Sequence, residues 1–180
     1  MMKTLLASAV AALALVAAGC GGSDGSSTAS PADEWAEGFC TAITAWSNSL
    51  GSATEQFASP SSLTQDGFTD AANEVKSSTE TLAGDLRVLG PPDTESGEAV
   101  ETALTKLATS LETEVPKIET AANDVSGLTD LPGAITAITT SLASMGTDFA
   151  ATLQAIGSAD VGGELQTALE DSPACADISS

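Results

Sequence analysis

Histidine and tyrosine are absent from this chain of 180 residues, and lysine and arginine together number only five. Without histidine, the chain lacks the commonest general base and a common metal ligand. This absence excludes Ser-His-Asp and Cys-His catalytic arrangements, His-based zinc sites and the Glu-x-x-His motif of di-iron helical bundles. The chain also has no P-loop and no Rossmann glycine motif. We therefore expect a protein that is not an enzyme and that holds no metal or cofactor.

Acidic side chains dominate the charge of the chain. Its 25 Asp and Glu residues leave a formal net charge of −20. A surface of this sign repels nucleic acid and anionic lipid headgroups. We therefore expect no nucleic-acid partner, and we expect that membrane attachment depends on a covalent lipid rather than on the protein surface.

The amino-terminal segment has the layout of a secretory signal: a cation at Lys3, an uncharged apolar run over residues 5–19, and Cys20 directly after it. The small residues Ala17, Ala18 and Gly19 before Cys20 resemble the lipobox of bacterial lipoproteins. In that family, a diacylglyceryl group is attached to the cysteine thiol and cleavage makes this cysteine the first residue. The resemblance implies a signal peptide over residues 1–19, lipidation of Cys20, and a location on the extracytoplasmic face of the cell membrane. Two acyl chains suffice for stable anchoring.

Three other interpretations of this segment remain open. It could be an ordinary signal peptide cut after residues 12–14, a core helix, or an uncleaved membrane helix, although it is shorter than the ~20 residues that span a bilayer. Residues 20–32 are rich in Gly and Ser, which predicts a flexible tether. A single folded domain is expected over residues 33–178.

Apolar residues recur at steps of three and four along the predicted domain, which is the spacing of amphipathic helices. The four long rows cover residues 35–57, 68–89, 100–125 and 131–156, and a shorter one lies within residues 161–170. Short links between such helices favour antiparallel neighbours. We therefore predict an all-α fold: an antiparallel up-down four-helix bundle with a short fifth helix at the carboxyl end.

Several local signals refine this prediction. Ser30 and Pro31 suit the start of the first helix, and residues 62–65 have a capping-box pattern for the second. Pro116 predicts a kink in the third helix, where an amphiphile could enter. The apolar row of the fourth helix predicts one continuous buried seam: Leu131, Ile135, Ile138, Leu142, Met145, Phe149, Leu153 and Ile156.

Two cysteines remain once Cys20 is assigned to lipid. Cys40 and Cys175 lie near the two ends of the predicted domain, and in an exported protein such a pair forms a disulfide by default. The antiparallel topology brings the start of the first helix and the end of the fourth to the same end of the bundle, where the fifth helix could return Cys175 to Cys40. Two separate buried thiols, or a metal site, are the alternatives.

Carboxylates are the remaining candidates for chemistry. Two groups share a helical face, and either could form a weak Ca²⁺ site or supply an acid pair for glycoside hydrolysis; solvated faces are the favoured interpretation. The groups are Asp66, Asp70 and Glu74 on the second helix and Glu95, Glu98 and Glu101 on the third. Trp35 and Trp46 could line a ligand pocket, but their positions on the first helix favour core packing.

The strings at residues 33–40, 89–94 and 172–175 are similar to a group of small actinobacterial lipoproteins and secreted helical proteins with paired cysteines near both ends. That resemblance implies no particular activity. We expect a monomeric, non-enzymatic lipoprotein that presents its bundle to another component of the cell envelope. Binding of an apolar or amphiphilic ligand between helices is the alternative, and a carboxylate-dependent hydrolase of cell-wall glycans is a remote one.

Overall fold

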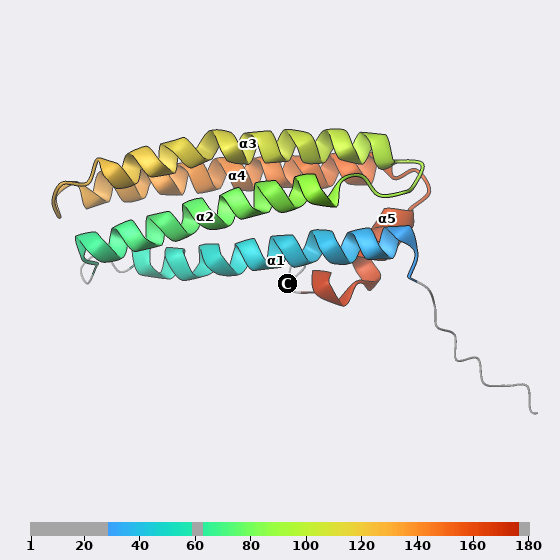
Figure 1. Cartoon of the computed structure of the whole chain (residues 1–180), viewed down its shortest axis with the longest axis horizontal. Coiled ribbons are helices and arrows are strands. Elements are labelled where there is room, and N and C mark those ends of the chain that lie inside the picture. The colour runs from blue at the N-terminus through green and yellow to red at the C-terminus, as the bar shows by residue number, and fades with distance from the viewer. Residues whose placement is uncertain (1–28, 59–62, 177–180) are drawn as a thin grey trace, which may run out of the picture.

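The computed structural model describes residues 29–58 and 63–176 (Figure 1). The predicted signal peptide, the lipidation site at Cys20 and most of the predicted tether lie outside the described residues. Five α-helices and one 3-10 turn make up the described part, which contains no strand. Their bounds are α1 Pro31–Phe57, α2 Gln65–Leu89, α3 Gly97–Asn123, α4 Leu131–Ala159, α5 Glu164–Asp171 and the turn η1 Pro173–Cys175. The predicted all-α fold with a short fifth helix is confirmed.

The four long helices run alternately in opposite directions (Figure 1). Helix α1 packs closely against α2, α2 against α3, and α3 against α4. The backbones of α1 and α4 approach each other far less, and their aromatic side chains bridge the distance: the ring centroids of Phe39 and Phe149 lie 6.4 Å apart. The bundle is therefore packed more loosely on the side where its first and last long helices meet.

Polar caps fix where the helices begin. Ser30 caps α1, as predicted, and forms a capping box with Asp33: the backbone N–H of Ser30 donates to the Asp33 carboxylate at 2.8 Å, and Asp33 N–H donates to the Ser30 hydroxyl at 3.1 Å. Bonds from the Ser30 N–H and hydroxyl lower the pKa of Asp33. At α2, the prediction that Ser62 is the cap is wrong. The helix begins at Gln65, and the Thr64 hydroxyl accepts from Gly67 N–H at 3.1 Å.

Asp130 organises the turn that precedes α4. Its carboxylate accepts bonds from the Ser126 hydroxyl at 2.8 Å, the Ser126 N–H at 3.0 Å and the Gly127 N–H at 3.1 Å. These donors, the Ser126 hydroxyl first, lower the pKa of Asp130 because they stabilise its charged form. The acid therefore fixes the turn that reverses the chain between α3 and α4.

The aromatic side chains of α1 lie in the core, and they include the two tryptophans for which core packing was predicted. Trp35, Phe39, Trp46 and Phe57 are all buried. Trp46 Nε1 donates to the hydroxyl of Thr79 on α2 at 3.1 Å, and this hydroxyl in turn donates to the carbonyl of residue 75 at 2.7 Å. Thr79 is fully buried, and its place in an otherwise apolar row is explained by the indole that it satisfies.

Trp35 ties α1 to the loop between α2 and α3. Its Nε1 donates to the carbonyl oxygen of Gly90 at 3.0 Å. Gly90 ends α2 with a φ of 63°, a conformation that favours glycine. Both tryptophans therefore serve packing and hydrogen bonding in the core, as the favoured interpretation of the sequence held.

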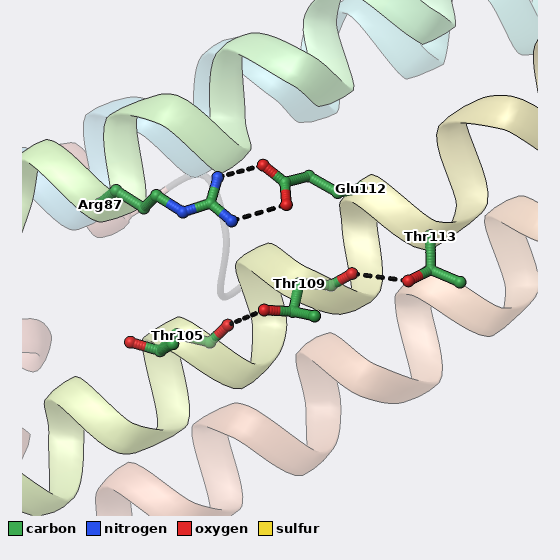
Figure 2. A network of polar contacts seen from close by, with 5 residues as sticks. All are labelled: Arg87, Thr105, Thr109, Glu112 and Thr113. Carbon is green, nitrogen blue, oxygen red and sulfur yellow. Dashed lines mark hydrogen bonds and ion pairs between the residues drawn. The ribbon is translucent and has the colours of Figure 1, made fainter.

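Figure 2 shows polar contacts between α2 and α3 and along α3. The guanidinium of Arg87 on α2 forms a bidentate ion pair with the carboxylate of Glu112 on α3. The hydroxyls of Thr109 and Thr113 donate to carbonyls four residues earlier, each at 2.8 Å. Each of these hydroxyls is thereby satisfied within its own helix.

The predicted disulfide between Cys40 and Cys175 is present. It joins α1 to η1 with a Cα–Cα distance of 5.0 Å across a sequence separation of 135 residues, and both cysteines are buried. Helix α5 and η1 fold back onto the first half of α1 (Figure 1), and the Thr44 hydroxyl donates to the Ala174 carbonyl at 3.3 Å. The end of the domain is therefore fastened to its beginning.

Candidate functional site

The loosely packed side of the bundle contains a pocket of about 290 Å³ between α1, α4 and α5. Its walls are mostly apolar. Phe39 and the disulfide come from the α1 side and the carboxyl-terminal segment, Phe149, Leu153 and Ile156 from α4, and Leu169 from α5. Ligand pockets span ~300–1,000 Å³, so this pocket lies at the lower limit of that range and suits a small apolar group.

The pocket exists because α4 does not bury the seam that its sequence predicts. The prediction of one continuous buried row is wrong along part of the helix: Ile135, Leu142 and Phe149 are only half-buried, and Leu153 is 37% exposed. The buried face is rotated toward α3 and includes the small or polar residues Ala134, Ser141 and Thr152. Since α1 does not close onto α4, part of the apolar stripe of α4 faces the gap between them.

Helix α5 covers only one end of that gap. It has 8 residues against the 29 of α4. Leu165 and Ala168 bury its inner face, while Leu169 is half-buried at the pocket. A helix of this length, at 1.5 Å per residue, covers only the carboxyl-terminal part of the stripe, and Ile135 and Leu142 beyond it stay half-buried.

Three polar residues line the same pocket: Asp160, Gln166 and Glu170. The backbone N–H of Gln166 donates to the Asp160 carboxylate at 2.8 Å, and the side-chain amide of Gln166 donates to the Glu170 carboxylate at 2.9 Å. Asp160 is half-buried and the other two are exposed, so they form the polar mouth of an apolar pocket.

The structure does not bring the predicted carboxylates together into a site. Asp66, Asp70 and Glu74 are exposed along α2. The three acids of the second group, Glu95, Glu98 and Glu101, are exposed at the start of α3 and before it. Among the described residues, no group of three or more Cys, Asp or Glu is placed to hold a metal ion.

Pro116 is not where the pocket lies, although the alternative ligand-binding hypothesis placed the entry of an amphiphile there. Helix α3 continues through the proline from Gly97 to Asn123. The pocket is lined instead by residues from the first half of α1 and the end of α4, and Pro116 is not among its lining residues. Nearby Glu114 is buried and its carboxylate is paired with Lys117 Nζ at 2.6 Å.

Sequence reasoning missed the residues that form the pocket. Phe149, Leu153 and Ile156 were assigned to a closed seam, and Asp160 and Glu170 were not singled out. One signal was available: Phe149 and Leu153 share a stripe with Ile135 and Leu142 that is offset from Ala134 and Ser141, but periodicity alone does not say which stripe a neighbour covers.

Comparisons with known proteins add no relative: no protein-family model, curated protein or solved structure matches the chain. Within the described residues, no helix combines the length and apolar character needed to cross a membrane.

Proposed function

We propose that the protein is a lipid-anchored, non-enzymatic binding module on the extracytoplasmic face of the cell membrane, and that it holds a small, largely apolar ligand in the pocket between α1, α4 and α5. The observation that carries the ligand proposal is the pocket itself, about 290 Å³ of mostly apolar space next to a folded core. The pocket is open to solvent at its polar residues and mostly apolar along its walls, and ligand sites typically combine apolar walls with a few polar groups in this way.

The anchor is the second part of the proposal and rests on the lipobox-like sequence ending at Cys20. The disulfide supports an exported location, because such bonds persist in oxidising compartments. An acyl anchor would hold the pocket close to the membrane, where apolar and amphiphilic molecules concentrate.

A pair of glycine substitutions on α4 tests the ligand proposal. Gly157 lines the pocket, and a Cβ added there meets nothing within 4 Å; the same is true at Gly146, which is on the same helix away from the pocket. Gly157→Phe should fill the pocket without disturbing the helix, because glycine is a poor helix former. Gly146→Phe makes the same chemical change outside it.

Binding is measured with a neutral apolar fluorophore such as 1-aminoanthracene. We expect saturable binding to the parent protein and to Gly146→Phe, and at least a tenfold loss in Gly157→Phe, which corresponds to about 1.4 kcal/mol. Native mass spectrometry of protein made in its own host checks for a retained natural ligand. Equal binding to all three proteins, or no saturable binding to any, would contradict the ligand proposal.

An envelope protein is the other partner expected from the sequence, and it stays a prediction. The most exposed large apolar side chains are Val88 on α2, Leu128 in the α3–α4 connection and Val161 in the α4–α5 connection. They lie on three different segments, so they favour no particular docking face. Crosslinking in intact cells followed by purification tests this possibility, and a reproducible single partner would support it.

A further inference from the structure

Charge is distributed unevenly around the pocket. Its three enclosing helices, α1, α4 and α5, contain no Lys or Arg. The cations of the described part are on α2 and α3, and Lys76, Arg87 and Lys117 of these are paired with acids there. A charged group that enters the pocket is therefore surrounded by helices that contain acidic residues and no basic ones.

Two of those acids line the pocket itself. Asp160 and Glu170 are held toward Gln166, one by its backbone N–H at 2.8 Å and the other by its side-chain amide at 2.9 Å. Each of these bonds uses a single carboxylate oxygen. Because an ionised carboxylate has two oxygens and about four acceptor positions, both acids can accept a further donor from a ligand.

We infer that the pocket selects a small cationic amphiphile, with its apolar body among Phe39, Phe149 and Ile156 and its ammonium group at Asp160 and Glu170. This inference rests on the proposed function and adds the charge of the ligand. An anionic headgroup at the same place would meet two like charges with no cation on the surrounding helices. An ammonium group donates up to three hydrogen bonds, and at the mouth it retains part of its hydration, which limits the desolvation cost of binding.

Three probes of equal chain length distinguish the contribution of the apolar chain to binding from that of the head group: octylammonium, 1-octanol and octanoate. Isothermal titration of the intact protein at low salt should give the tightest binding for octylammonium, weaker binding for octanol and the weakest for octanoate. We expect a preference of about tenfold for the ammonium over the alcohol, the size that two partly screened charge contacts supply. Added salt should reduce this preference and leave the affinity for octanol nearly unchanged.

The double variant Asp160→Asn with Glu170→Gln removes the two charges and keeps oxygen acceptors for the bonds from Gln166. It should bind octanol like the parent and lose the preference for octylammonium. The matched control, Glu55→Gln with Asp66→Asn, makes the same change of net charge at exposed sites near the end of α1 and at the start of α2, which do not line the pocket. It should keep the preference.

The outcomes separate the two proposals. If octanol and octylammonium both bind, with equal affinity in the parent protein, the ligand proposal stands and the inference about charge is overturned. Equal loss of preference in the control variant also overturns it, because the effect would then come from overall charge. If no probe binds, the proposed ligand-binding function fails as well. Circular dichroism of both variants verifies that they are folded.

Discussion

Removing the disulfide should lower the stability of the domain substantially without unfolding it. In Cys40→Ala with Cys175→Ala, the unfolded chain gains the freedom of a loop that spans 135 residues of sequence. The chain-entropy model gives about 5 kcal/mol for a loop of this length, although measured effects are often smaller. We therefore expect the free energy of unfolding to fall by about 3–5 kcal/mol, out of the ~5–15 kcal/mol that is typical of domains.

The structure also indicates which part of the fold should be destabilised most by removal of the disulfide. The bond fastens η1 to α1, while α2, α3 and α4 pack against one another without it. The folded double variant should keep nearly all of the helical circular dichroism signal of the parent protein. It should bind the neutral fluorophore more weakly, because Cys40 and Cys175 line the pocket and α5 forms one of its walls.

Urea unfolding followed by far-UV circular dichroism measures the change. Reduced parent protein is the control, because it loses the bond and keeps both sulfur atoms. Its stability should lie close to that of the double variant. A loss below about 1 kcal/mol in both proteins would refute the loop-closure argument, and a large loss in the alanine variant alone would assign the effect to core volume.

Four further predictions concern the bundle. Gly97→Ala should lower the free energy of unfolding by about 1–3 kcal/mol, because the added Cβ would lie 2.4 Å from a backbone oxygen of the preceding loop. Gly84→Ala, whose Cβ would meet nothing within 4 Å, should raise it by about 0.5–1 kcal/mol, and urea unfolding compares the two variants. Thr79→Val should lower the free energy of unfolding by about 1–3 kcal/mol, because it removes the hydrogen-bond acceptor of Trp46 Nε1. Thr79→Ser keeps the hydroxyl and should lower it by less in the same assay. Asp130→Ala should lower the melting temperature at neutral pH. Because folding lowers the pKa of Asp130 from 3.8, the stabilisation by its carboxylate is present above pH 3.8 and is lost as the pH falls through the lower folded-state pKa. A difference in melting temperature between parent and variant that persists in strong acid would contradict this assignment. The melting temperature of the whole domain should rise with added salt, because screening reduces the repulsion among side chains with a net charge of −20, and a salt-independent melt would show that this repulsion is already compensated.

Much of the fold could be predicted because its signals are local. The three-and-four spacing of apolar residues predicted the number and order of the helices, and Ser30 with Pro31 marked the start of α1, because both signals act within the first turn. Cys40 and Cys175 could be paired because an antiparallel bundle brings its two ends together. The cap of α2 was misplaced by two residues, since Thr64 and Ser62 both offer a hydroxyl and sequence alone does not choose between them.

The candidate site could not be predicted in the same way. Periodicity determines that α4 has an apolar stripe through Phe149 and Leu153, but whether that stripe is covered depends on the distance to the neighbouring helix. Tertiary structure decides this distance through side-chain bulk: Phe39 and Phe149 meet ring to ring at 6.4 Å, so the backbones of α1 and α4 remain apart and α5 roofs only one end. By itself, then, the sequence determined the helices, their order and the disulfide that joins the ends. Only the packing of large side chains from distant segments decided that a pocket remains between them and that Asp160 and Glu170 line it.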